Sequence, residues 1–389
     1  MSPALPPGDA VALARALVAI DSRNPVLVSG GPGEGACARF LAQVLGDWGF
    51  RVELQQVASG RPNVIARIGT PGGRSLLLNG HLDTVGTEGM VHEPWEPAVR
   101  DGRVYGRGSA DMKAGVAAMC VAAWRAAHAT PGGLGGEVIV TAVVDEEYQS
   151  LGTSAIVAGG VTADAAIVTE PTRLAVCTAH KGFVWADLSV RGVAAHGSRH
   201  DVGVDAIALA ALVVAELEAY QQRELTTRSH PLLGRPSLHA SFIRGGTGLS
   251  TYPDECTVQL ERRTIPGESA ADFVREIEAA AARVRAARPE LDVAIVQGFS
   301  QEPNEVPASH AVVECLTDAL AARQLPAPVE GLSCWTDAAL LTAAGIPAIC
   351  FGPGDIAVAH AKEEYVPLAD VDSAADVLES AIVAWCGTA

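Results

Sequence analysis

The sequence has little positive charge, few aromatic residues and no long apolar run. Its 389 residues carry 28 lysines and arginines against 45 acidic residues, a formal net charge of −17. This charge repels phosphate backbones and anionic lipids, so we expect neither nucleic acid nor a membrane as a partner. No stretch approaches the roughly twenty apolar residues that cross a bilayer. Charged residues interrupt the first apolar stretch, which excludes a secretory signal and favours the cytoplasm.

Paired cysteines are also missing. The eight cysteines stand singly, without a Cys-x-x-Cys pair. This spacing argues against a disulfide framework or a cysteine zinc site, and predicts reduced, buried thiols. The length exceeds that of one typical hydrophobic core, so two domains are expected.

The outer parts of the chain alternate apolar strand patterns with helical ones. This alternation is typical of an α/β domain with a mostly parallel sheet. Strands are predicted at 64–68, 76–78, 138–144, 166–168 and 348–351, and helices at 9–20, 113–127 and 311–322.

The middle of the chain follows another order. Its pattern reads β-α-β-β-α-β, which is typical of a ferredoxin-like domain. Strands are predicted at 183–190, 238–243, 256–260 and 291–296, and helices at 204–220 and 270–285. We therefore expect residues 179–298 to be an inserted domain, which splits the first domain into 1–178 and 299–389.

Acidic residues and histidines follow several of the predicted strands. The carboxyl ends of strands form the ligand crevice of an open α/β sheet, so these side chains are expected to converge. The clusters are His81-Leu82-Asp83, Asp145-Glu146-Glu147, Glu170 and His360, and Asp111 joins them from a glycine-rich loop before a helix.

Each of these signals is weak alone, because a charged residue after a strand is usually a solvated loop residue. The combination is stronger, since histidine and carboxylate are the ligands of hydrolytic metal sites. Two metals about 3.5 to 4 Å apart need one bridging carboxylate and roughly two further ligands each. The clusters supply this set and leave a carboxylate free to activate water.

The motifs also resemble a known family. They are His81-Leu82-Asp83-Thr84-Val85, the block from Gly106 to Gly115, Glu146-Glu147, Thr169-Glu170-Pro171, and Phe351-Gly352-Pro353-Gly354 before Ala359-His360. Together they resemble the di-zinc family of aminoacylases, acetylornithine deacetylases, succinyl-diaminopimelate desuccinylases and glutamate carboxypeptidases. The resemblance implies a split catalytic domain, an inserted lid that forms a homodimer, and two divalent ions per chain, zinc before cobalt or manganese.

The resemblance also implies roles for individual residues. His81 and Glu170 would hold one metal, Glu147 and His360 the other, and Asp111 would bridge them. Glu146 would be the general base, and Asp83 would orient the imidazole of His81. The Asp111-Met112 peptide bond is expected to be cis.

Further roles fall in or beside the inserted domain. His196 is expected to stabilise the oxyanion in the partner subunit's site, and Arg263 to grip a substrate carboxylate. Its neighbour Arg262, on the opposite strand face, is expected to be a solvated charge. Ser250 replaces an asparagine that many relatives use for substrate, and Gly352 is a candidate for the acyl pocket, as is the Trp335-Thr336-Asp337 segment.

The predicted activity is hydrolysis of an N-acyl amino acid, as in acetylornithine deacetylases and aminoacylases. A carboxypeptidase, dipeptidase or desuccinylase of the same family is the alternative, with a short peptide as one possible substrate. A non-catalytic metal-binding homologue is a third reading, which the complete set of ligands argues against. No Gly-x-Ser-x-Gly motif follows a strand, which disfavours a serine hydrolase.

Overall fold

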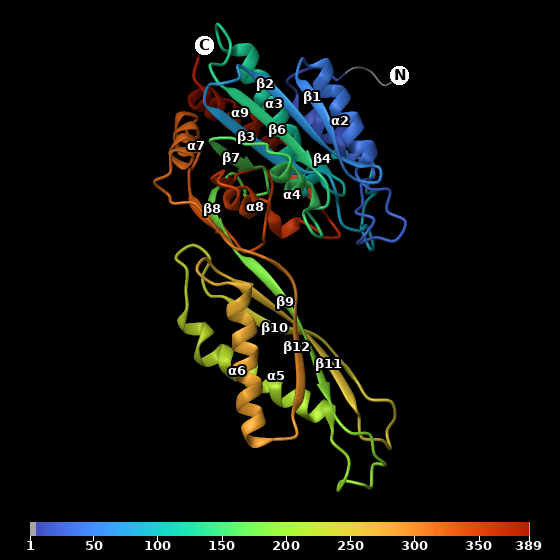
Figure 1. Ribbon diagram of the computed structural model, residues 1–389. Coiled ribbons are helices and arrows are strands. Elements are labelled where there is room, and N and C mark those ends of the chain that lie inside the picture. The colour runs from blue at the N-terminus through green and yellow to red at the C-terminus, as the bar shows by residue number, and fades with distance from the viewer. Residues whose placement is uncertain (1–4, 389) are drawn as a thin grey trace. The chain divides into compact units, whose positions relative to one another are not determined.

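The apolar runs of the outer segments form one mixed sheet in the computed structural model, which describes residues 5–388 (Figure 1). Its centre is parallel and its edges are antiparallel, in the order β1-β2-β6-β3-β7-β15-β8. The strands are β1 (Arg51–Ala58), β2 (Arg61–Gly69), β6 (Glu137–Val143), β3 (Ser75–His81), β7 (Ala165–Val168), β15 (Ala348–Cys350) and β8 (Val176–His180), and β13 (Asn304–Glu305) and β14 (Val329–Leu332) also pair with β8. The predicted α/β class is confirmed.

Helices cover both faces of this sheet (Figure 1). On one face α3 packs against α9, and both contact β3; on the other, α4 packs against α8. Alanine and glycine dominate α3, so its backbone lies close to its neighbours. The helices are α1 (Ala10–Val18), α2 (Gly35–Asp47), α3 (Ala114–Ala129), α4 (Leu151–Ala158), α7 (Ala311–Ala322), α8 (Ala338–Ala343) and α9 (Leu368–Cys386). A small sheet joins β4 (Ala98–Arg100), β5 (Arg103–Tyr105) and β16 (Tyr365–Pro367).

The inserted segment forms a separate antiparallel sheet in the predicted β-α-β-β-α-β order. Its strands lie in the order β10-β11-β9-β12. Alternate residues of β9 face α5 and α6 and form the core of this segment. Both helices described within 179–305 of eight residues or more lie on this face of the sheet. The elements are β9 (Gly182–Arg191), α5 (Ala206–Arg223), β10 (Ser237–Gly245), β11 (Glu255–Thr264), α6 (Ala270–Ala287) and β12 (Asp292–Gln301).

The chain contacts divide the molecule into two units. Unit 1 holds the described residues up to 178, together with 306–330 and those from 336 onward, whereas unit 2 holds 179–305 and 331–335. No helix within residues 5–388 is long and apolar enough to cross a bilayer. Six of the eight cysteines are buried.

One expectation about unit 2 is wrong. Arg262, predicted to be a solvated charge, is only 1% exposed. It lies on the same side of β11 as the buried Val258 and Leu260, which face the helices. Its Nη2 donates to Glu268 Oε1 at 2.6 Å, so an ion pair offsets part of the cost of burying the guanidinium.

Candidate active site

The predicted metal ligands converge at the carboxyl edge of the main sheet, all within unit 1. His81 ends β3, Glu147 follows β6, Glu170 follows β7, and Asp111 stands in the turn before α3. His360 comes from the loop after β15. The predicted cis peptide bond between Asp111 and Met112 is confirmed.

Asp111 lies between two imidazoles. Its Oδ1 is 3.0 Å from His81 Nε2, and its Oδ2 is 3.2 Å from His360 Nε2. Glu147 Oε2 lies 3.0 Å from His360 Nε2, whereas Glu170 Oε1 lies 3.9 Å from His81 Nε2. One carboxylate thus faces both histidines, and each histidine has one further carboxylate of the predicted set beside it.

The electrostatics of this cluster suit cations. Among the described residues, none of its carboxylates pairs with an arginine or lysine. Burial raises the pKa of Glu146 and Glu170 well above the usual range, and repulsion from neighbouring carboxylates adds to the rise. Burial lowers the pKa of His360, but its hydrogen bonds to Asp111 and Glu147 outweigh this and raise it to about 10.

The donor set therefore fits divalent metal ions. Two groups of three donors have ligand atoms within 4.8 Å of one another: His81, Asp111 and Glu147, and His81, Glu146 and Glu170. Histidine nitrogen with carboxylate oxygen is the ligand chemistry of zinc and similar ions. The second group includes Glu146, expected as the base, so this carboxylate lies at the cluster itself.

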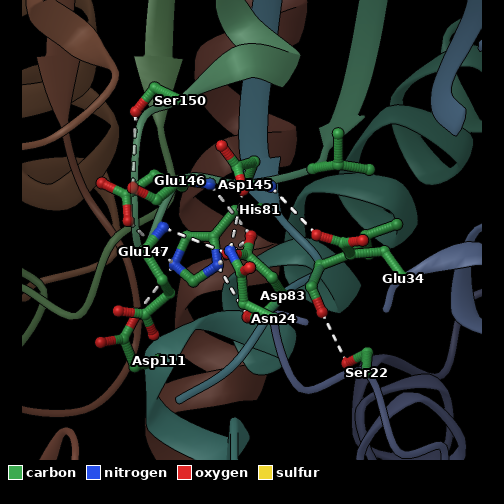
Figure 2. Close-up of polar contacts among 12 residues, drawn as sticks. Ser22, Asn24, Glu34, His81, Asp83, Asp111, Asp145, Glu146, Glu147 and Ser150 are labelled. Carbon is green, nitrogen blue, oxygen red and sulfur yellow. Dashed lines mark hydrogen bonds and ion pairs between the residues drawn. The ribbon is translucent and has the colours of Figure 1, made fainter. Parts of the chain in front are cut away.

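Asp83 contacts the cluster in a way that the sequence did not suggest (Figure 2). The main-chain oxygen of Asp83 accepts a hydrogen bond from the Nδ1–H group of His81 at 3.0 Å. This bond directs His81 Nε2 toward the other metal ligands. The carboxylate Oδ1 is farther from Nδ1, at 3.6 Å. The two carboxylate oxygens of Asp83 instead accept hydrogen bonds from the backbone N–H groups of Glu146 and Glu147, each at 3.1 Å. Asp83 thereby positions both glutamates.

A chain of buried polar groups extends from Asp83 away from the cluster (Figure 2). The Asn24 amide donates to Asp83 Oδ2 at 2.9 Å and to Asp145 Oδ1 at 3.0 Å. Arg61 donates to the same Asp145 oxygen at 2.9 Å and pairs with Glu34 at 2.6 Å. These bonds hold Asp145, whose φ of 68° is left-handed, just before the two glutamates.

Glu364 holds the loop that carries Asp111. Its carboxylate is fully buried. Its Oε1 accepts hydrogen bonds from the backbone N–H groups of Ala110 and Asp111, at 3.0 and 3.1 Å. Its Oε2 accepts one from the backbone N–H of Gly108 at 3.1 Å and one from the Arg107 guanidinium at 2.6 Å. Since His360 is only four residues away, Glu364 ties together the two segments that supply Asp111 and His360.

Gly352, which follows β15, and Asp337, which follows β14, also lie within unit 1. A Cβ on Gly352 would come within 2.5 Å of the main-chain oxygens of Thr169 and Glu170, so this glycine allows the loop to approach the Glu170 segment. Asp337 is buried and accepts the Thr153 hydroxyl at 2.7 Å. Burial raises the pKa of Asp337 to about 6.

Three predicted site residues belong to unit 2. His196 and Ser250 occupy exposed loops joined by a bond of 2.7 Å from the Gly197 N–H to the Ser250 oxygen. His196 Nδ1 accepts the Ser198 N–H at 3.3 Å, which leaves the proton on Nε2. Arg263, on the open face of the unit 2 sheet, pairs with Glu261 and lies over the Phe183 ring.

A cluster of histidines and carboxylates at this edge of an α/β sheet can bind ions that activate water, so the class is a metal-dependent hydrolase. The chain belongs to the peptidase family M20/M25/M40, whose sequence profile matches residues 77–384. It is a metallohydrolase that acts on amide bonds.

Proteins similar to this chain are named for several substrates. The chain is 31% identical over 348 residues to the acetylornithine deacetylase of Myxococcus xanthus, covering 87% of this chain and 89% of the relative. It is 28% identical to an N-formyl-4-amino-5-aminomethyl-2-methylpyrimidine deformylase of Halalkalibacterium halodurans, covering 87% and 86%. Its fold is similar to a Staphylococcus aureus tripeptidase, with a TM-score of 0.82 at 20% identity over 97% and 98%.

Proposed function

We propose that the protein hydrolyses the amide bond of N-acyl amino acids, as an acetylornithine deacetylase or aminoacylase does. The observation that carries the proposal is the place of Glu146. Its carboxylate is 3.9 Å from His81 Nε2, while its N–H is fixed by Asp83. The similarity to the Myxococcus xanthus deacetylase supports the acyl amino acid as substrate.

Five side chains would hold two divalent ions, with zinc as first choice and cobalt or manganese as alternatives. His81 and Glu170 would bind one ion, Glu147 and His360 the other, and Asp111 would bridge them. When bound, such ions polarise the carbonyl group and lower the pKa of water. The two-sided contact of Asp111 with His81 and His360 supports its bridging role.

Glu146 is the general base of the proposed reaction. Its carboxylate takes a proton from the attacking water as the new C–O bond forms. The same carboxyl group then gives the proton to the leaving nitrogen as the C–N bond breaks. The hydrogen bonds from Glu146 and Glu147 to Asp83 hold the base beside the ligand, so the neighbouring glutamates keep separate duties.

Unit 2 supplies substrate contacts in this proposal. Arg263 binds the free carboxylate, and Ser250 is a further substrate contact. Gly352, in unit 1, is a candidate for the acyl pocket. His196, whose Nε2 carries a proton, donates to the oxyanion in the site of a second copy within a homodimer. The cytoplasmic location stays a prediction of the sequence.

A dipeptidase, carboxypeptidase or desuccinylase is the second candidate. The fold similarity to the tripeptidase and, with a TM-score of 0.70, to human carnosine dipeptidase 1 keeps peptides among the possible substrates. The non-catalytic reading is set aside, because the chain belongs to a family of amide hydrolases and its candidate ligands and Glu146 lie together.

The experiment is a hydrolysis screen of acetyl, succinyl, formyl and aminoacyl derivatives of one amino acid, with metal content measured in parallel. We expect turnover of simple acyl derivatives by protein that holds two ions per chain. Turnover of the aminoacyl derivative alone would favour a dipeptidase. Full activity with a ceiling of one ion per chain would contradict the two-metal site.

A further inference from the structure

Unit 2 carries a cluster of aromatic rings that the proposed chemistry does not use. We call Phe183, Trp185, Phe299 and Trp335 the aromatic patch. The Phe183 ring lies 5.3 Å from that of Trp185, 5.8 Å from that of Phe299 and 6.4 Å from that of Trp335. Aromatic residues make up only 5% of the sequence, so three rings gathered around that of Phe183 require an explanation.

The patch is open because of the strand pattern. Along β9, Val184 and Ala186 are buried beneath the helices, so Phe183 and Trp185 stand on the opposite face of the sheet. Trp185 is 41% exposed, and Phe183, Phe299 and Trp335 are half-buried. A core role would cover these rings, whereas contiguous exposed apolar surface is typical of binding sites.

Positive charge lies beside the patch. The Arg263 guanidinium is 5.5 Å from the centre of the Phe183 ring. Lys181 donates to the main-chain oxygen of Arg235 at 2.7 Å. Burial lowers the pKa of Lys181, and the nearby charges of Arg263 and Arg235 lower it further, whereas that of Glu268 raises it. The three cations therefore lie near one another, with Glu268 beside Lys181 and Glu261 beside Arg263. In a protein of net charge −17, such a group favours a carboxylate.

The patch also has an unused hydrogen-bond acceptor at its edge. The His180 ring meets that of Trp335 edge-on at 6.1 Å and is 1% exposed. Its Nδ1 donates to the Lys181 main-chain oxygen at 3.0 Å, so Nε2 carries a lone pair. Within residues 5–388 this nitrogen has no hydrogen-bond partner. It can accept an N–H group, as an amide ligand would offer.

We propose that the aromatic patch binds the aromatic or large apolar group of the substrate, while Arg263 takes its carboxylate and His180 Nε2 accepts an N–H. This proposal rests on the proposed function and names its substrate class: acyl amino acids that carry a ring. The ring belongs either to the amino-acid side chain or to the acyl group, which share this chemistry. Small, charged substrates such as N-acetylornithine are disfavoured.

Two matched substrate pairs test the proposal on the full-length metal-loaded enzyme. N-acetylphenylalanine against N-acetylalanine places the ring in the side chain, and N-benzoylglycine against N-acetylglycine places it in the acyl group. In at least one pair, kcat/KM should be about 10-fold or more higher for the ring-bearing member. Equal values within both pairs overturn the proposal.

Variants locate the effect on the patch. Trp185→Ala and Phe299→Ala should remove most of the preference, mainly by raising KM for the ring-bearing member. The control is Phe242→Ala, another aromatic residue of the same sheet, 54% exposed, whose ring is beside Arg244. It should keep the preference. A preference that survives both patch substitutions, or is lost equally in the control, overturns the proposal.

Failure of the proposed function gives a separate result. If none of the four compounds is hydrolysed, binding of N-benzoylglycine is measured by calorimetry instead. Saturable binding that Phe299→Ala weakens about 10-fold, and Phe242→Ala does not, supports the patch without the activity. Absence of binding overturns the patch as well.

Discussion

The candidate functional side chains of the two units differ in burial. In unit 1 the candidate metal ligands and their partners are mostly buried, and Asp83, Asn24 and Glu364 are each held by several hydrogen bonds. In unit 2 His196 and Ser250 lie on exposed loops. Burial in a hydrogen-bonded network fixes geometry, whereas exposed loops adapt to what they bind.

This difference suggests a division of labour. In the proposed function, unit 1 carries the metal ligands and the general base, and unit 2 carries residues that would select among amides. The relatives fit this division, since they share the family while their names specify an acetyl derivative or a formyl derivative. The predictions below test whether chemistry and selection separate along the same boundary.

Glu146→Gln should have the largest effect. Turnover should fall between about 10²- and 10⁴-fold, because an amide cannot accept the proton of water. Metal content should stay near normal. The matched control is Glu147→Gln at the next position, which should lose one metal instead. Substantial activity in Glu146→Gln would show that the two roles are assigned the wrong way round.

His196→Ala tests whether unit 2 also contributes to chemistry. Activity should fall about 10²- to 10³-fold if His196 stabilises the oxyanion. Mixing it with Glu146→Gln protein should restore roughly a quarter of wild-type activity, because half of the dimers then contain one complete site. Subunit exchange is first established with a fluorescence probe. Exchange without recovered activity would show that His196 does not act across a dimer.

Glu364→Gln should weaken metal binding about 10- to 100-fold, as loss of a group that orients ligands does. The side-chain amide of glutamine has an NH₂ group in place of one acceptor oxygen. This donor would face two N–H groups of the Asp111 loop, which would then lose their acceptor. Competition with a chelator gives the affinity. Glu363→Gln, at the exposed neighbouring position, is the control and should bind metal normally. Equal metal affinities in the two variants would show that Glu364 does not orient the metal ligands.

Arg263→Ala should have a smaller effect, confined to recognition. The side chain is 37% exposed and already paired with Glu261, so screening reduces its contribution. We expect KM to rise about 10-fold for substrates with a free carboxylate and to change little for their amides. Arg244→Ala on the same sheet serves as the control. Equal losses for acid and amide would be evidence against a carboxylate contact.

Ser269→Ala should have the smallest effect and should touch unit 2 alone. Ser269 and Asp272 form a reciprocal cap at the start of α6. Losing it should lower the free energy of unfolding by about 1 kcal/mol. Denaturation of the metal-loaded protein should show the loss while metal content is unchanged. A change in metal affinity would show that the units are not independent.

The sequence predicted much of the sheet and the donor set, because the candidate ligands follow recognisable apolar runs. It missed β1, none of whose residues is buried and which forms no apolar run. It also missed Asn24, Arg61 and Glu364, since each acts on residues far away in the chain. An isolated glutamate has no local pattern that distinguishes a buried partner from a surface charge.

Arg262 is different, because a usable signal was present. Cys256, Val258 and Leu260 are apolar at every second position, and continuing that alternation places residue 262 on the covered face. The preference of arginine for solvent was given more weight than the alternation. A charged residue in phase with buried neighbours should therefore be assigned to the interior, with an acidic partner sought nearby.

The position of β15 has a consequence for biosynthesis. This strand separates β7 from β8, so the main sheet cannot be completed until residue 350 has left the ribosome. Most of unit 2, residues 179–305, has emerged well before that point and can fold while its host is incomplete. Proteolysis of nascent chains halted near residue 340 should find the insert resistant and the outer segments sensitive. Equal sensitivity of both would contradict this order of folding.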